Sequence, residues 1–367
     1  MQHTVTADAP ALRNNRAEGD RSHRARLSIV VLVFVLAGTA ILSLATGASD
    51  ASVAAVIRTW LAQLSGSDAE LSARDSIIIH DIRFPRMVLG VLIGASLAVC
   101  GATMQGLFRN PLADPGIVGV SSGAGLGAVL MIVLGSTALG PLTVHLGIYA
   151  LPLAAFFGGL VTTFLLYRVS TRHGRTSVAT MLLAGIALAA LAGAATGILV
   201  YVADDQQLRD LTFWGMGSIA GATWSKVLAA GPIILLALLA GPLLAGGLNA
   251  MTLGEATARH MGLPVQRFKA TAIVVVAAAT GAAVAVSGGI GFVGIVVPHL
   301  LRLLIGPDHR YLLPASALLG ASLLLAADAL ARTIVAPAEL PIGIITAVVG
   351  APFFLWILLS RRGVLDL

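Results

Sequence analysis

Long apolar runs alternate with short polar segments along most of this chain. A helix needs about 20 predominantly apolar residues to cross the hydrocarbon core of a bilayer, and runs of this size recur throughout the sequence. The pattern predicts an all-α polytopic membrane protein with about ten transmembrane helices. Because two pairs of runs meet almost without a break, at 287–290 and 306–311, nine or eleven spans are alternatives. The predicted spans are residues 27–47, 86–107, 115–135, 142–167, 177–202, 227–247, 268–287, 290–306, 311–332 and 342–360.

The polar segments divide the chain into regions. We expect a cytoplasmic N-terminal tail at 1–26, a transmembrane domain at 27–360 and a cytoplasmic C-terminal tail at 361–367. Within the domain, residues 48–85 are predicted to lie outside the membrane and residues 251–266 to form a charged cytoplasmic segment. A cleaved signal peptide is the alternative for the N-terminus, but its apolar part would span about 7–15 residues, fewer than the first run has here.

Composition and charge agree with a membrane protein. Of the 367 residues, 57% are hydrophobic and 11% are charged, whereas a soluble domain has about 25% charged residues. The 23 Lys and Arg exceed the 17 Asp and Glu, but they lie at the ends of apolar runs and form no dense patch, so no nucleic-acid partner is expected. Most of them share one side of the predicted spans, which places both termini in the cytoplasm by the positive-inside rule.

Two glycine-spaced segments resemble each other. Gly94-Ala-Ser-Leu-Ala-Val-Cys-Gly101 lies in the second predicted span and Gly281-Ala-Ala-Val-Ala-Val-Ser-Gly288 in the seventh. Because five spans separate them, the two segments would cross the membrane in opposite directions, as in the inverted repeats of many transporters. Chance similarity between helices rich in Gly and Ala is the alternative.

The sequence contains no recognisable catalytic constellation. It lacks the G-x-x-x-x-G-K-[ST] phosphate loop, and its only lysines are Lys226 and Lys269, so it does not bind ATP phosphates by that route. It also lacks a His-Glu-x-x-His pattern and a Ser/His/Asp set on loops. The single cysteine, Cys100, excludes an internal disulfide. We therefore expect no enzyme activity, no metal and no cofactor.

Ordered motifs over residues 82–355 identify a family. The segments are Arg83-Phe-Pro-Arg86, Gly101-Ala-Thr-Met-Gln-Gly106, Asn110-Pro-Leu-Ala-Asp-Pro-Gly116, Gly288-Gly-Ile-Gly-Phe-Val-Gly-Ile-Val-Val-Pro-His299, Glu339-Leu-Pro-Ile-Gly343 and Gly350-Ala-Pro-Phe353. With these segments in this order, the sequence resembles the iron-chelate and cobalamin permease family of ABC importers.

The resemblance implies an architecture and a set of partners. It implies a type II importer permease in the bacterial inner membrane, working as a homodimer. Two ATP-binding cassette subunits would bind on the cytoplasmic side and hydrolyse the ATP, and one periplasmic substrate-binding protein would dock on the outside. The resemblance also implies that Arg83, Arg86 and Arg332 pair with glutamates of the binding protein. We expect these arginines at a water-facing rim, because charge inside a membrane is costly.

On the cytoplasmic side, the resemblance implies a coupling segment and a gate. Residues 251–266 resemble the helix that fits a cleft on the ATPase, with an ordinary cytoplasmic loop as the alternative. The predicted coupling residues are Gly254, Glu255, Ala258, Arg259 and Gly262, and the predicted gate residues are Asn110, Leu112, Thr176 and Ser177.

The resemblance limits the transported molecule, the cargo, to a bulky chelate. The segment around Phe213 and Trp214 resembles that of haem permeases, so we predict haem, with these aromatic side chains lining the mouth where the macrocycle enters. A ferric siderophore and cobalamin are the alternatives. An ion-coupled secondary transporter is less favoured, because it would place acidic residues near the midplane. Asp328 is the only good candidate, and it lies near the outer end of its predicted span.

Overall fold

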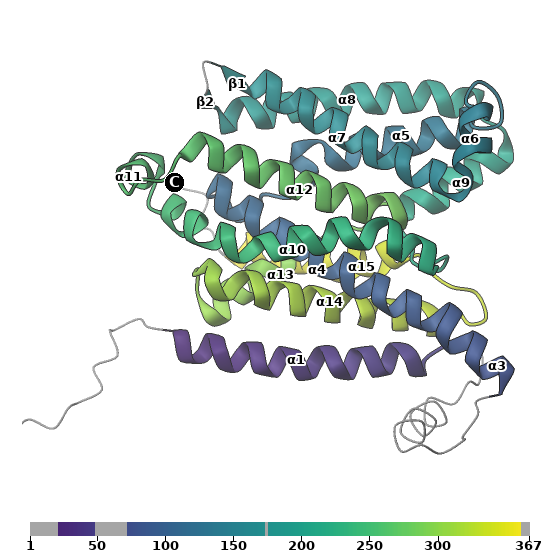
Figure 1. Cartoon of the computed structure of the whole chain (residues 1–367), viewed down its shortest axis with the longest axis horizontal. Coiled ribbons are helices and arrows are strands. Elements are labelled where there is room, and N and C mark those ends of the chain that lie inside the picture. Colours follow the sequence, from purple (N-terminus) through teal and green to yellow (C-terminus); the bar gives the residue numbers. More distant parts are fainter. Residues whose placement is uncertain (1–20, 48–71, 173–174, 361–367) are drawn as a thin grey trace, which may run out of the picture.

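The computed structural model of the chain describes residues 21–47, 72–172 and 175–360. Long helices run side by side through this part of the chain (Figure 1). The helical elements are α1 (Ser22–Ala45), α3 (Ala73–Ser76), the π-helix η1 (Ile77–Arg83), α4 (Phe84–Phe108), the 3-10 turn η2 (Pro115–Val118), α5 (Val120–Leu134), α6 (Gly140–Leu146), the 3-10 turn η3 (Gly147–Tyr149), α7 (Ala150–Ser170), α8 (Val178–Val202), α9 (Asp205–Met216), α10 (Trp224–Thr252), α11 (Glu255–His260), α12 (Val265–Ser287), α13 (Val293–Ile305), α14 (His309–Thr333) and α15 (Ile342–Ser360).

The helices confirm the predicted polytopic fold. Each of the ten predicted spans contains a helix, and in the described residues seven helices are long and apolar enough to cross a membrane. The three shorter apolar helices are α5, α13 and α15. The only strands in the described residues are β1 (Thr171–Arg172) and β2 (Arg175–Thr176), which pair antiparallel in a short hairpin between α7 and α8.

Some helices begin at other residues than the predicted spans. The helix of the second span begins before residue 86, because α3, η1 and α4 run on without a break as one helical stretch, Arg74–Phe108. The last residues of the predicted external segment 48–85 are therefore helical, and residues 48–71 lie outside the described part. The third span starts at Val120, since residues 115–118 form a 3-10 turn, and the eighth starts at Val293.

Helix α4 forms the centre of the bundle. It packs against α10, α12, α13 and α14, and every residue from Ile93 to Leu107 is buried. Glycines permit this close approach: a Cβ at Gly94 would overlap the backbone of Gly320, and one at Gly101 would overlap the carbonyl of Gly294. By contrast, α1 lies at the edge of the bundle against α14 (Figure 1).

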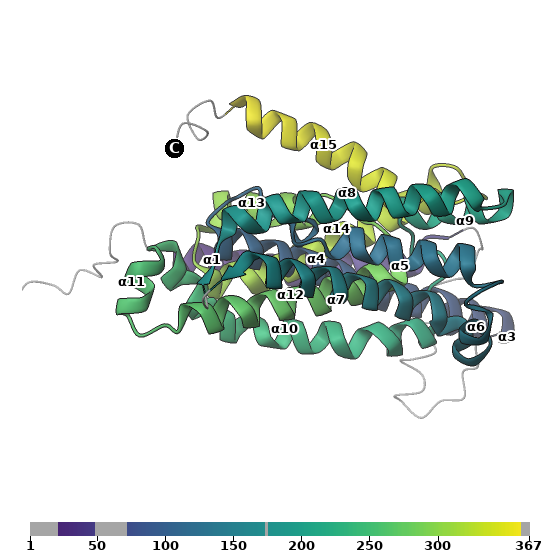
Figure 2. The same ribbon diagram turned by 90° about the horizontal axis from the view of Figure 1, so that it is seen from above.

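The bundle has two distinct ends. We call the end that carries α11 and the β1–β2 hairpin the coupling end, and the end that carries α3, α6 and α9 the opposite end (Figure 1). Helix α1 begins and α15 finishes at the coupling end, as an even number of crossings requires. Helix α15 slopes away from the other helices toward that end (Figure 2).

Two helices start inside the bundle. Helix α5 follows a turn that returns from the coupling end, and Gly119 before it lies against Thr162 of α7. Helix α13 follows an irregular segment that returns from the opposite end, and Gly294 in its first turn lies against Gly101 of α4. One unit consists of the long helix α4, the turn after it and the short helix α5. The other consists of the long helix α12, the irregular segment after it and the short helix α13, and the two units run in opposite directions. This arrangement agrees with the inverted repeat predicted from sequence.

Candidate functional site

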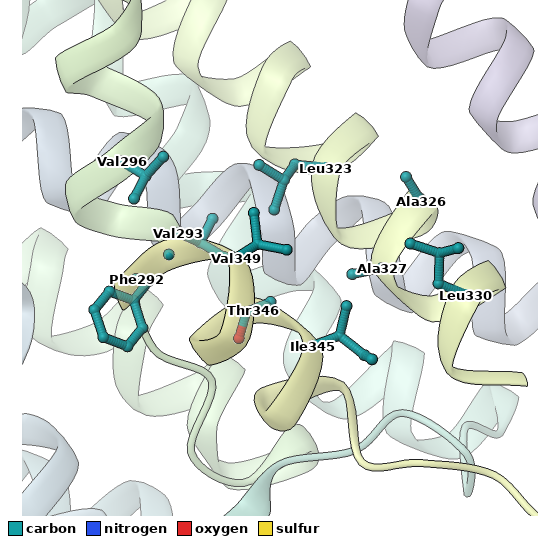
Figure 3. A pocket seen from close by; sticks show the side chains of 11 residues that line it. Phe292, Val293, Val296, Leu323, Ala326, Ala327, Leu330, Ile345, Thr346 and Val349 are labelled. Carbon is teal, nitrogen blue, oxygen red and sulfur yellow. The ribbon is translucent and has the colours of Figure 1, made fainter. Parts of the chain in front are cut away.

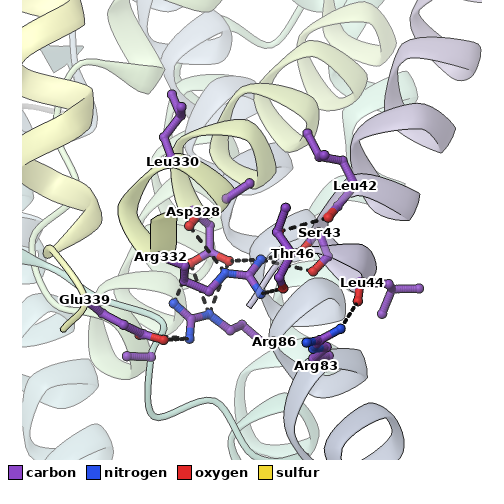
Figure 4. Close-up of polar contacts among 12 residues, drawn as sticks. Leu42, Ser43, Leu44, Thr46, Arg83, Arg86, Asp328, Leu330, Arg332 and Glu339 are labelled. Atoms are coloured by element: carbon purple, nitrogen blue, oxygen red, sulfur yellow. Dashed lines mark hydrogen bonds and ion pairs between the residues drawn. The ribbon is translucent and has the colours of Figure 1, made fainter. Parts of the chain in front are cut away.

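An arginine cluster lies where α4 begins and where α1 and α14 end (Figure 4). Arg86, in the first turn of α4, donates to both carboxylates of the cluster: Nη2 lies 2.8 Å from Asp328 Oδ1 and Nη1 lies 2.9 Å from Glu339 Oε2. The Asp328 side chain is fully buried, whereas that of Glu339 is 34% exposed. Such charge-assisted bonds are about twice as strong as neutral ones, so Arg86 joins α4 firmly to α14 and to the segment before α15.

Two further arginines hold the end of α1. Arg332 shares Asp328 with Arg86, at 2.8 Å from Oδ2, and donates to the carbonyl oxygens of Ser43 and Thr46 at 3.1 and 2.9 Å. Arg83 donates to the carbonyl of Leu44 at 2.7 Å. The last carbonyls of a helix have no partner within it, and these side chains supply one, so they fix α1 to α4 and α14.

The structure thus brings the three predicted docking arginines together but does not place them at a water-facing rim. Arg83, Arg86 and Arg332 are 3%, 5% and 4% exposed. The expectation of exposed side chains was wrong because Asp328 and the end of α1 provide buried partners. Sequence reasoning considered Asp328 only as a candidate for ion coupling, although its place four residues before Arg332 signals a helical ion pair.

The predicted coupling segment forms a short helix at the coupling end. Helix α11 spans Glu255–His260. Gly254 and Gly262 bracket it with positive φ angles of 99° and 89°, which other residues rarely adopt. Ala258 is fully buried and packs α11 against α10 and α12, whereas Arg259 is exposed. Helix α11 therefore presents an exposed, charged face on a fixed base.

A lysine joins this helix to the predicted gate. Lys269 on α12 is 1% exposed, and its Nζ lies 2.5 Å from Glu255 Oε1 and 3.3 Å from the carbonyl oxygen of Thr176. The N–H of Thr176 in turn donates to Gln266 Oε1 at 2.9 Å. The coupling helix and the segment before α8 are thus linked through one buried charge, which sequence reasoning had not singled out.

The other predicted gate residues lie in turns at the same end. Asn110 Oδ1 accepts from the N–H of Leu112 at 2.9 Å and closes the turn after α4. Ser177 caps α8, with Oγ accepting from the N–H of Thr180. Arg109 just before the first turn adopts a left-handed conformation, and its Nη1 lies beside Gly254.

The two predicted aromatic residues do not form one surface. On α9, Phe213 is 60% exposed, whereas the neighbouring Trp214 packs against the alanine-rich cluster of α5, α7 and α12. Successive residues of a helix point about 100° apart, so only Phe213 faces outward.

Two cavities lie beside the short helices. An apolar one of about 180 Å³ lies between α13, α14 and α15, with Phe292, Leu323 and Val349 in its wall (Figure 3). A more polar one of about 190 Å³ lies where the segments before α5 and α13 meet, and Asp114 and Thr280 line it.

The sequence of this chain matches one family of known proteins. The model of the FecCD transport family matches residues 31–360. The chain belongs to this family. The predicted family is therefore confirmed, and the chain is a multi-span component of a membrane transport system.

Curated relatives are similar over most of the chain. The hemin transport system permease protein of Yersinia pestis is 51% identical over 282 residues, which cover 77% of this chain and 83% of the relative. The cobalamin import system permease protein of Halobacterium salinarum is 46% identical, over 78% of this chain and 74% of the relative. The vitamin B12 import system permease protein of Klebsiella pneumoniae is 44% identical, over 80% of this chain and 86% of the relative.

Solved structures have the same fold. An inward-facing metal-chelate type ABC transporter aligns with a TM-score of 0.77 and 32% identity, covering 90% of this chain and 98% of that chain. PsaBC of Streptococcus pneumoniae aligns with a TM-score of 0.53 and 18% identity, covering 78% of this chain and 94% of that chain. This likeness shows similarity of fold alone.

Proposed function

We propose that this chain is the permease subunit of an ABC importer that carries haem across the bacterial inner membrane. The observation that carries the proposal is the 51% identity to the hemin permease of Yersinia pestis. A ferric siderophore and cobalamin remain the alternatives, and the 46% identity to a cobalamin permease makes cobalamin the stronger of these. The ion-coupled alternative loses support because Asp328 pairs with two arginines.

The proposed assembly is a homodimer with two ATPase subunits and one binding protein. Both termini and the coupling end face the cytoplasm in this proposal. The exposed apolar side chains of α15, such as Val348, Leu355 and Trp356, suit contact with lipid or with the second copy. Because α15 leaves the bundle (Figure 2), a second copy packed there would bury both its sides. ATP is hydrolysed by the partner subunits.

In the proposed cycle, α11 transmits movement of the ATPase to the gate. Its exposed face would fit a cleft on the ATPase, with Leu253 and Met261 beside it, which are 62% and 63% exposed. The buried pair of Lys269 and Glu255, together with the bond from Lys269 to Thr176, supports a direct connection. When α11 moves, these bonds carry the segment at Thr176 and Ser177 with it, while Asn110 and Leu112 form the other wall of the gate.

The arginine cluster is the proposed dock for the binding protein. Arg86 and Arg332 share the carboxylate of Asp328, and Arg86 also pairs with Glu339. Glu339 is the more exposed of these two carboxylates, so a glutamate of the binding protein would replace it as the partner of Arg86. Charged contacts of this kind set the orientation and the association rate of docking more than its affinity. Phe213 on α9, the proposed lining of the entry for haem, lies at the same end of the bundle as this dock (Figure 1).

The experiment that tests the proposal is ATP-dependent uptake in proteoliposomes that contain this chain and its cognate ATPase. Haem, a ferric siderophore and cobalamin are each supplied on their own binding protein at equal concentration. We expect haem to accumulate and the other two to stay outside. Uptake of cobalamin or a siderophore alone would support an ABC importer but contradict haem as its substrate. A lack of uptake with all three would contradict the proposed function.

A further inference from the structure

A third cavity, of about 250 Å³, lies at the coupling end and has a basic lining. It is formed where the ends of α4, α10 and α13 meet the start of α14. Arg109, Arg302 and His309 line it together with the polar side chains of Gln105 and Thr252. The volume is several times the roughly 30 Å³ that one water occupies in the liquid, so a small polar group fits inside.

The positive charge around this cavity is not neutralised by the described part of the chain. Arg302 Nη1 donates to Gln105 Oε1 at 2.5 Å, and among the described residues neither Arg302 nor Arg109 forms an ion pair. The nearby carboxylate of Asp308 accepts from the side chain of Asn249 at 2.6 Å and from the N–H of Arg310. Two guanidinium groups therefore face the cavity with donors to spare.

The third group is an imidazole whose tautomer follows from its contacts. Asn249 Oδ1 accepts from the backbone N–H of His309 at 2.9 Å, while Asn249 Nδ2 donates to Asp308. His309 Nδ1 lies 2.9 Å from the same Oδ1 and must therefore carry a proton. In a neutral imidazole Nε2 is then an acceptor. His309 is 1% exposed, and its Nε2 has no hydrogen-bond partner in the described structure.

This combination of groups defines a ligand chemistry. Guanidinium groups bind phosphate oxygens through paired hydrogen bonds, and a buried acceptor that lacks a donor costs free energy until a ligand supplies one. We propose that this cavity binds a phosphate group that carries or adjoins a hydroxyl, with Arg109 and Arg302 donating to its oxygens and His309 Nε2 accepting from the hydroxyl. The phosphate comes either from the head group of a lipid such as phosphatidylglycerol or from free hydrogen phosphate.

Occupation of the cavity would fix the start of the gate turn. Arg109 directly precedes Asn110 and holds a left-handed conformation with φ of 51°. A phosphate bound to both arginines would tie this residue to α13 and α14. Binding itself does not depend on the proposed function, whereas its effect on the gate does.

The test compares two phosphate sources on the complete permease–ATPase complex. Native mass spectrometry measures how many molecules of phosphatidylglycerol and phosphatidylcholine stay bound when both are offered equally, and isothermal titration measures binding of inorganic phosphate and of dimethyl phosphate, which lacks the hydroxyl. The variants are Arg302→Gln, Arg109→Gln and His309→Gln. Arg310→Gln is the matched control, because Arg310 is exposed on the same turn and does not line the cavity.

Each outcome decides the proposal. We expect the two arginine variants to weaken binding about tenfold each, the size of one charge-assisted hydrogen bond, and Arg310→Gln to leave it unchanged. Selective retention of phosphatidylglycerol indicates a lipid head group, and binding of inorganic phosphate above dimethyl phosphate indicates the free ion. Equal binding in the wild type and in both arginine variants, or no binding of either probe, overturns the proposal. The arginine variants decide it even where His309→Gln fails to fold.

Discussion

Lys269 and Glu255 form an ion pair between α12 and α11, with Nζ and Oε1 2.5 Å apart. The lysine side chain is 2% exposed and the carboxylate 33% exposed. The same ammonium group donates to the carbonyl of Thr176, so one charge connects the coupling helix with the segment that begins α8. A charge buried this deeply is stable only with such partners, which makes the connection rigid.

Replacing Lys269 with methionine should uncouple ATP hydrolysis from transport. Methionine preserves the apolar stem but removes both hydrogen bonds, so movement of α11 no longer reaches Thr176. We expect uptake per ATP hydrolysed to fall about tenfold, the equivalent of one lost charged hydrogen bond, while hydrolysis continues. Uptake and phosphate release are measured in the same proteoliposomes.

The chain offers a matched control for this variant. Lys226, the other lysine, lies at the start of α10, away from α11, and Lys226→Met should leave the uptake ratio unchanged. Lys269→Arg should restore part of the coupling because it keeps the charge. An unchanged ratio in Lys269→Met would remove this residue from the coupling mechanism.

Replacing Asp328 with asparagine should destabilise the protein. Arg86 and Arg332 would remain buried without the carboxylate that they share, and breaking a buried pair in this way costs about 3–5 kcal/mol. Thermal unfolding of the purified protein in detergent should therefore begin at a lower temperature. Asp210→Asn on the exposed side of α9 is the control and should unfold like the wild type. Equal unfolding temperatures would mean that water reaches the two arginines.

Replacing Glu339 with glutamine should strengthen docking of the binding protein. The change removes the more exposed partner of Arg86 and leaves that guanidinium group with an unbalanced charge. We expect a severalfold higher association rate that declines with added salt, because such charges act mainly on the encounter. Surface plasmon resonance at two salt concentrations measures it. Arg86→Gln should have the opposite effect, and identical rates for both variants would exclude this cluster as the dock.

Alanine at Gly101 should prevent normal packing of α4 and α13. Its Cβ would overlap the carbonyl of Gly294, and neither backbone can move without displacing the whole helix. Yield of monodisperse protein after gel filtration should drop sharply. Gly38→Ala in α1 has nothing within 4 Å of the new Cβ and should be neutral or slightly stabilising, because alanine favours a helix over glycine. Normal yield for Gly101→Ala would show that the two helices separate easily.

The fold followed from sequence more completely than the site did. The apolar runs gave the helices because each span must satisfy its own backbone in lipid. The starts of α5 and α13 were misplaced, since Pro115 and the glycines from Gly288 to Gly291 belong to apolar runs by composition but not to α-helices. Burial of Arg86 was not predictable, because its partner Asp328 lies 242 residues away. Lys269 escaped notice for a similar reason: only the fold brings Thr176 to it.

The short length of α13 has a consequence for how the protein is made. Its 13 residues reach about 20 Å, less than the roughly 30 Å of the hydrocarbon core. Left alone in lipid, the irregular backbone from Gly288 to Phe292 would expose unpaired N–H and C=O groups. Insertion of α13 must therefore wait until α4 and α14 have both been synthesised and have met. The late steps of biogenesis are thus a folding reaction inside the bilayer, and variants at Gly101 or Gly294 should be degraded by membrane proteases after their synthesis is complete.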